Sequence, residues 1–158
     1  MTLENPEERI REGGIFAGLA IDLKKSPLDR GDFLVRGLVS FDQATGAVAV
    51  SEAVRVGQTI QFQIRDRESA VADLEETLAG LALSLGARRP AFGCYFNCLG
   101  RGSGLFGVPD HDVTMIRKHL GDFPLAGFFG NGEFAPIGRT NFFHNYTGVL
   151  MVFPGETI

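Results

Sequence analysis

The spacing of apolar residues changes near Asp66, and this change limits the folds open to the chain. Before Asp66, short apolar or alternating segments between polar turns are typical of β-strands. Four such strands are predicted, in 15–22, 33–42, 46–52 and 58–66. After Asp66, the apolar residues in 67–86 recur with the period of an amphipathic helix. Four strands before any helix argue against the regular alternation of a doubly wound α/β fold.

The helix predicted in 67–86 has clear ends. Asp66 precedes it as an N-cap, and Gly86 follows it as a stop signal. Its apolar residues form one face: Ala70, Val71, Leu74, Leu78, Leu81 and Leu85. In the last strand before it, alternation places Ile60, Phe62 and Ile64 inward and Gln61, Gln63 and Arg65 outward.

The rest of the chain predicts three strands and a second, shorter helix. The strands are expected in 90–99, 124–134 and 141–153, and the helix in 110–121. The composition of 90–99 indicates burial on both faces. The predicted order is β-β-β-β-α-β-α-β-β. We therefore expect an α+β fold, a single mixed and largely antiparallel sheet with two main helices packed on it. The strand order stays open.

Length and composition narrow the class of protein. A chain of 158 residues suits one domain, which we place over 14–158 after a charged leader or linker at 1–13. The formal charge of −4 argues against nucleic-acid binding. Neither a spanning helix nor a signal peptide is evident, so we expect a cytoplasmic protein without membrane partners.

The cysteines and histidines give no sign of a metal site. Cys94 and Cys98 lie four apart in a predicted strand, roughly 13 Å from each other, too far for a disulfide or one shared metal. The histidines, His111, His119 and His144, are scattered. We expect neither metal nor cofactor.

A glycine-rich stretch follows the predicted strand 90–99. Gly102, Gly104 and Gly107 match G-x-G-x-x-G, the pattern of a dinucleotide-binding turn. That turn must open directly into a helix, whereas Val108 and Pro109 intervene here. We therefore favour a tight connection that forms one wall of a recognition pocket.

Polar residues also interrupt the two apolar segments that end the sequence. Asn131 and Glu133 lie in one of them, and His144, Asn145 and Thr147 in the other. Buried polar groups are costly unless they are paired. These residues must therefore satisfy one another or face a shared polar cavity.

Several segments resemble signature motifs of a known family. "FNCLGRG", "PLAGFFGNGEFAP" and "FFHNYTGVLMVF" are similar to the C-terminal half of the FIST module, named for F-box and intracellular signal transduction proteins. The segment 31–66 resembles the strand-rich region that precedes them, so the likeness runs from about Gly14 to Phe153.

The resemblance implies a sensory, signal-transduction module rather than an enzyme. It implies a small ligand, with amino acids the usual suggestion, and partners such as the N-terminal half of the module or a signalling domain. A homodimer formed through the open edges of the sheet is a separate expectation. Arg101 would bind a ligand carboxylate and Glu133 its ammonium, between walls of Phe128, Phe129 and Phe143. The expected ligand-binding residues are Cys98, Gly100, Arg101, Gly102, Asn131, Glu133, His144, Asn145 and Thr147.

Two other classes of function stay open. Cys98 could act as a nucleophile if Arg101 lowered its pKa and His144 served as its base. Alternatively, the open edges of a mixed sheet could make the chain a protein-interaction module without a small ligand.

Overall fold

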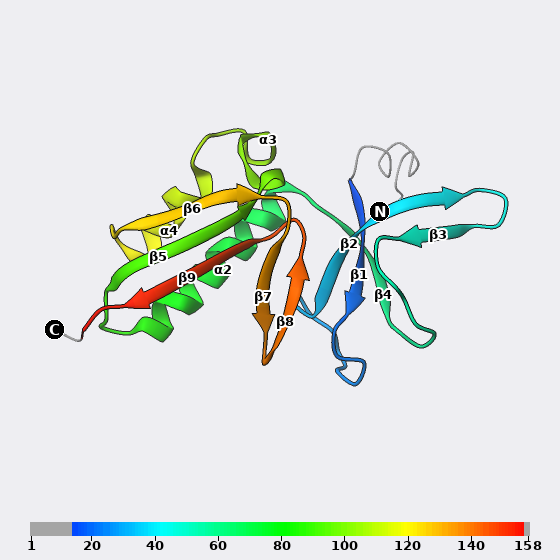
Figure 1. Ribbon diagram of the computed structural model, residues 1–158, viewed down its shortest axis with the longest axis horizontal. Helices are drawn as coiled ribbons and strands as arrows, with labels where there is room; N and C mark the ends of the chain where they lie inside the picture. The colour runs from blue at the N-terminus through cyan, green and yellow to red at the C-terminus, as the bar shows by residue number, and fades with distance from the viewer. Residues whose placement is uncertain (1–13, 157–158) are drawn as a thin grey trace. The chain divides into compact units, whose positions relative to one another are not determined.

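The computed structural model of the chain describes residues 14–156 (Figure 1). The leader predicted at 1–13 lies outside the described residues. The chain divides into two compact units, one ending at Arg65 and the other beginning at Asp66, and each is described by itself. The single domain expected over 14–158 stays a prediction. No helix in 14–156 is both long enough and apolar enough to cross a membrane.

The first unit is an antiparallel sheet in the order β3-β2-β1-β4. Its strands are β1 (Ile15–Ala20), β2 (Phe33–Asp42), β3 (Ala47–Val50) and β4 (Ile60–Ile64). Every residue of the inner strand β1 is buried. The predicted β2–β3 hairpin is confirmed, and Gly46 closes it at a φ of 71°, which favours glycine.

The inward side chains predicted for β4 are wrong for Ile60 and Phe62, while Ile64 is half-buried and Gln61 is exposed, as predicted. Ile60 is 42% exposed and Phe62 is 61% exposed, whereas Gln63 is half-buried. β4 pairs only with β1 and forms an edge of this sheet. Alternation therefore separated the apolar from the polar face correctly, but it did not predict that Ile60 and Phe62 would be exposed on this edge strand.

The second unit packs helices on a three-stranded sheet. Its elements are α2 (Arg67–Leu85), β5 (Pro90–Cys98), η1 (Leu99–Arg101), α3 (Ser103–Phe106), α4 (His111–Leu120), β6 (Leu125–Gly130), β7 (Glu133–Ile137), β8 (Thr140–His144) and β9 (Gly148–Pro154). The sheet has the order β6-β5-β9, with β5 parallel to β6 and antiparallel to β9. Tyr95 of β5 packs with Leu78, Ile116 and Phe123 in its core. A two-stranded sheet, β7-β8, completes the unit.

The two helices follow their local signals closely. Asp66 caps α2 by accepting a hydrogen bond from the Ser69 amide, and Gly86 ends it at a φ of 60°. α4 starts after Asp110 and stops before Gly121. The α+β class is confirmed, and the order of strands and helices is roughly as predicted, with the short helices η1 and α3 added between β5 and α4.

The prediction of a single sheet is wrong, because the described strands form three sheets. The segment predicted as a strand at 124–134 divides into β6 and the start of β7, where Gly132 turns at a φ of 113°. The segment at 141–153 divides into β8 and β9, where Tyr146 has a φ of 64°. These left-handed residues bend the chain, so each segment supplies two strands instead of one.

The burial of β5 on both faces holds only at its carboxyl end, where Asn97 and Cys98 are both buried. Gly93, Tyr95 and Asn97 alternate along its buried face. On the other face Phe92 is 46% exposed. Figure 1 shows α2 and α4 together behind one side of this sheet.

Candidate functional site

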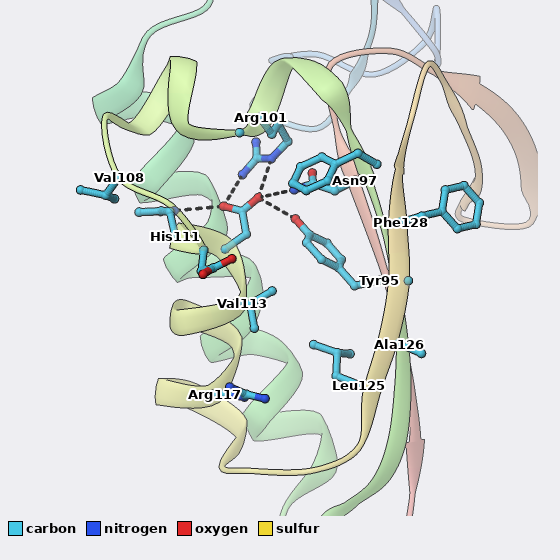
Figure 2. Close-up of a pocket in the computed structure, with 15 residues that line it drawn as sticks. Tyr95, Asn97, Arg101, Val108, His111, Val113, Arg117, Leu125, Ala126 and Phe128 are labelled. Carbon is cyan, nitrogen blue, oxygen red and sulfur yellow. Dashed lines mark hydrogen bonds and ion pairs between the residues drawn. The ribbon is translucent and has the colours of Figure 1, made fainter.

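The candidate site lies within the second unit, where the parallel strands β5 and β6 are joined through η1, α3 and α4. The carboxyl end of β5 and the first turn of α4 meet at a cavity of about 260 Å³ (Figure 2). Ligands of open α/β sheets bind at this position, beyond the carboxyl ends of parallel strands. Polar members of its wall are Tyr95, Asn97, Arg101, Asp110, His111, Asp112 and Arg117, and apolar members include Val108, Val113 and Leu125.

The carboxylate of Asp112 is the centre of this wall. Arg101 binds it with two nitrogens, Nε at 3.0 Å from Oδ2 and Nη2 at 3.3 Å from Oδ1. Tyr95 Oη and Asn97 Nδ2 donate to Oδ2 at 2.7 and 3.0 Å, and His111 Nδ1 lies 3.0 Å from Oδ1. Asp112 is 4% exposed. We call these five residues the Asp112 cluster.

The partners of Asp112 determine its charge. Burial alone raises the pKa of a carboxyl group, but the hydrogen bond and charge of Arg101 outweigh it, so the pKa of Asp112 lies below its ordinary value. Burial, reinforced by the charge of Asp112, raises the pKa of Tyr95. The cluster therefore contains an ionised carboxylate and a neutral phenol at neutral pH. Asp112 also lies in the first turn of α4, where the helix dipole favours a negative charge.

The glycine-rich stretch holds Arg101 in this cluster. It forms η1 and α3, and Gly107 ends α3 at a φ of 72°. Phe106 is fully buried; its ring lies 5.4 Å from the Arg101 guanidinium and stacks on His111 at 3.9 Å. The stretch is thus a short helical connection whose aromatic residue supports two members of the cluster.

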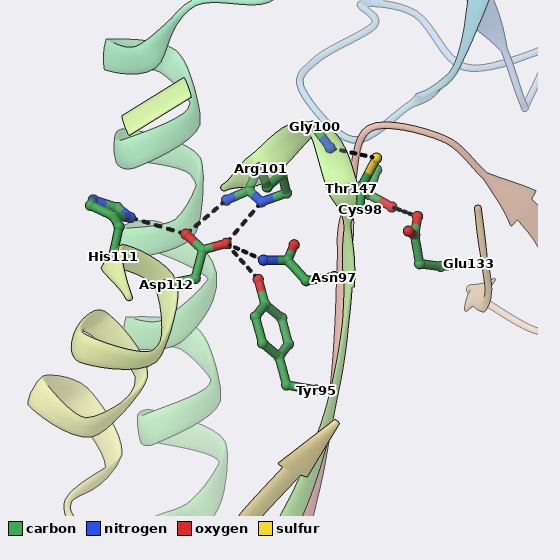
Figure 3. Close-up of polar contacts among 9 residues, drawn as sticks. All are labelled: Tyr95, Asn97, Cys98, Gly100, Arg101, His111, Asp112, Glu133 and Thr147. Carbon is green, nitrogen blue, oxygen red and sulfur yellow. Dashed lines mark hydrogen bonds and ion pairs between the residues drawn. The ribbon is translucent and has the colours of Figure 1, made fainter. Parts of the chain in front are cut away.

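A second polar group lies on the other side of β5 (Figure 3). Thr147 Oγ1 donates to Glu133 Oε2 at 3.2 Å, and the Thr147 carbonyl accepts from the Cys98 amide at 3.0 Å. Glu133 is 4% exposed, and its Oε1 accepts no hydrogen bond from the described residues. Burial raises the pKa of Glu133, against the lowering effect of the Thr147 hydrogen bond. We call Glu133, Thr147 and Cys98 the Glu133 group.

The residues expected to bind a ligand are divided between these two places. Arg101 and Gly102 line the cavity. Glu133, Thr147 and Cys98 form the Glu133 group, and Gly100 donates to Cys98 Sγ at 3.5 Å. His144 lies opposite Glu133 in the β7–β8 register, and its Nε2 lies 3.1 Å from the Ala135 carbonyl. Asn131 is exposed and Asn145 is half-buried. Their ligand-binding roles stay predictions.

Arg101 and Cys98 both have partners within the chain that bear on their predicted roles. The guanidinium group of Arg101 already binds a carboxylate within the chain, that of Asp112. Cys98 is buried, and the described contact of its sulfur is with the Gly100 amide. Phe128 and Phe129 belong to the part of β6 that borders the cavity, but the ring of Phe128 points away from the cavity (Figure 2). Phe143 packs against Phe134 at a ring distance of 5.3 Å.

Sequence reasoning missed four members of the Asp112 cluster: Tyr95, Asn97, His111 and Asp112. The sequence places Asp112 in the first turn of the helix predicted in 110–121, where a carboxylate is common without any further role, and Tyr95 and Asn97 in the mostly apolar strand predicted in 90–99. Their signal was the polar pair in 90–99, two residues apart and therefore on one face of a strand. Within 14–156, no three histidine, cysteine, aspartate or glutamate side chains are grouped to hold a metal ion.

The fold and the cavity define a class, an α+β domain with a polar cavity beside a parallel strand pair. Comparison with models of known protein families identifies the family within this class. The family model of the FIST C domain matches residues 2–136, so the chain belongs to the FIST C domain family, which is associated with signal transduction.

Curated relatives support this membership. The chain is 40% identical over 147 residues to an uncharacterized protein of Mycobacterium tuberculosis, a match that covers 93% of the chain and 38% of the relative. It is 41% identical over 150 residues to an uncharacterized protein of Mycobacterium bovis, covering 94% of the chain and 39% of the relative. The chain thus spans about two fifths of these relatives. No solved structure matches it.

Proposed function

We propose that this chain is a sensor module of signal transduction, which binds a small ligand in the cavity beside the Asp112 cluster and passes the signal to a partner domain or protein. The observation that carries the proposal is the cavity itself, about 260 Å³ beside a buried and ordered charged cluster. Drug-sized ligands occupy pockets of roughly 300–1,000 Å³. A smaller metabolite, such as an amino acid, suits this one.

The charged groups of the cavity support a ligand with a carboxylate. Arg101 is neutralised by Asp112, so it serves as the floor of the site. Arg117 also lines the cavity, and its side chain is 57% exposed. Its described partner is Asp122, which is 88% exposed and lies at 3.4 Å. Exposed ion pairs of this kind are weak, so a ligand carboxylate can displace Asp122.

The proposal needs binding and no chemical step. A sensor responds when its ligand has different affinities for two states of the protein. The buried Cys98 and the contact of His144 with the Ala135 carbonyl support this choice over a cysteine nucleophile. An N-terminal half of the module or a signalling domain would receive the signal.

A thermal-shift screen of the purified chain against amino acids and other small carboxylates tests the proposal. A ligand at a hundred times its dissociation constant adds about 2.7 kcal/mol of stability. For a domain of this size that raises Tm by several degrees. Arg117→Ala should abolish the shift and leave the unliganded Tm nearly unchanged, because this side chain is mostly exposed.

Lys118→Ala is the matched control. Lys118 follows Arg117 on α4, carries the same charge, and pairs with the exposed Glu75 at 3.4 Å, away from the cavity. If both variants retained the ligand-induced rise in Tm, Arg117 would not be part of the binding site. A screen without any shift would count against the sensor and favour an interaction module.

A further inference from the structure

One face of the β6-β5-β9 sheet has no helix on it. Side chains of a strand alternate between faces, so the neighbours of the core residue Tyr95 point away from α2 and α4. The strand registers add β6 and β9 residues to the same face, since Phe92 is paired with Phe153 and Phe96 with Phe128. We call this surface the open face; its large members are Phe92, Phe96, Phe128, Val149, Met151 and Phe153.

The open face is apolar and well exposed. Phe128 is 66% exposed, Phe92 and Met151 are each 46% exposed, and Phe153 is 38% exposed. The rings of Phe92 and Phe153 stack at 4.3 Å with 11° between their planes, and those of Phe96 and Phe128 meet edge to face at 5.2 Å. Contiguous apolar patches of this kind mark sites of association.

The open face carries no charge at any of its strand positions. Its remaining positions on β5 and β6 are Cys94, Ala126 and Gly130, whereas Cys98, at the carboxyl end of β5, is buried beside Thr147 and does not belong to the open face. Nucleic acids and charged peptides are recognised through opposite charges, which this face does not offer. An uncharged face instead tolerates its own copy, because a two-fold axis brings each residue type near itself without like-charge repulsion.

We propose that the open face is a self-association surface, on which a second copy of this chain packs sheet against sheet. Two β-sheets pack face to face about 10 Å apart, with their side chains interdigitated. In such a dimer the two open faces form a common apolar layer, and the helices of each copy remain outside. The aromatic pairs on β5, β6 and β9 supply the contacts.

The size of the face indicates a reversible dimer. Without the buried Cys98, β5 extends over residues 90–97, roughly 26 Å, and three strands are roughly 14 Å wide, so the footprint is about 370 Å² in projection. Interfaces at the small end of the range form weak complexes. We expect a dissociation constant of about 1–100 μM, which sedimentation can measure.

Sedimentation equilibrium of the full 158-residue chain, from about 0.5 to 500 μM, tests the proposal. The unmodified chain should shift from monomer to dimer with concentration. Phe128→Glu places one carboxylate per copy on the face and should raise the dimer dissociation constant at least thirtyfold, roughly the effect of losing an interface hot spot. Met151→Glu, on the opposite edge strand of the sheet, should act in the same direction.

Leu83→Glu is the matched control. Leu83 lies on α2, is 84% exposed, and faces away from the open face. It should leave the dimer unchanged, while circular dichroism verifies the fold of each variant. A monomer throughout the range would overturn the proposal. A dimer that Phe128→Glu and Met151→Glu both leave intact would overturn it too, and would leave the open face to another protein or to a further segment of a longer chain.

Discussion

Asp112 and Glu133 are two carboxylates with the same exposure and opposite surroundings. Each is 4% exposed, and they lie on either side of β5. Asp112 is held by donors of Arg101, Tyr95 and Asn97, with His111 in contact, and its pKa is lowered. Glu133 has one side-chain donor, Thr147, and its pKa is raised. The comparison teaches that burial sets the cost of a charge, while the number of donors decides whether the charge is retained.

The largest expected effect is that of Asp112→Ala. This substitution leaves the Arg101 guanidinium, 9% exposed, without its counter-charge, and losing one partner of a buried pair costs about 3–5 kcal/mol. Urea denaturation at pH 7 measures the change in the free energy of unfolding. Asp122→Ala, at an exposed position beside the same helix, should change it little. A loss below 1 kcal/mol for Asp112→Ala would show that the cluster is not an organising element.

Tyr95→Phe should have the next largest effect. It removes one hydroxyl donor from an ionised carboxylate, a loss of about 1.5–3 kcal/mol, and preserves the aromatic packing. Thr147→Val removes the corresponding donor from Glu133 and should cost about 1 kcal/mol, since that carboxyl group favours its neutral form. Equal losses in the two denaturation curves would contradict the difference between the two sites.

Acid should weaken the Asp112 cluster. The folded-state pKa of Asp112 lies below its ordinary value of 3.8, so its contribution to stability is present above that pH and is lost as the pH falls below it. Denaturation at pH values from 7 to 3 should therefore show a decrease in the free energy of unfolding at the acid end. This decrease should be smaller in Asp112→Asn. An unchanged decrease in that variant would assign acid sensitivity to other groups.

Glu133→Gln should have the smallest effect on the free energy of unfolding. The contribution of Glu133 should also change with pH in the direction opposite to that of Asp112. The folded-state pKa of Glu133 lies above its ordinary value of 4.5, so its favourable contribution is present below that pH and is lost as the pH rises through the folded-state pKa. Subtracting the stability curve of Glu133→Gln from that of the unmodified chain isolates this contribution. The difference should decline from pH 4.5 upward. A flat difference would mean that burial does not shift this group.

The local signals of the sequence predicted the helices well and the sheets less well. The Asp66 cap, the leucine face and Gly86 are all contained in about twenty residues, and α2 follows them closely. A helix satisfies its backbone within one segment, so such signals suffice. A strand satisfies its backbone through a partner elsewhere in the chain, and the sequence around Phe62 or Phe92 does not name that partner or the covered face.

In the candidate site, too, the sequence predicted some features and the tertiary structure decided the others. The sequence alone determined the α+β class, the family and the presence of a buried polar group, Glu133, within an apolar segment. The tertiary structure decided that Arg101 binds Asp112 and that Glu133 lies across β5 from this cluster. Side chains that alternate along one strand go to opposite faces, and only the packing of α4 and β7 against β5 determines which charges meet.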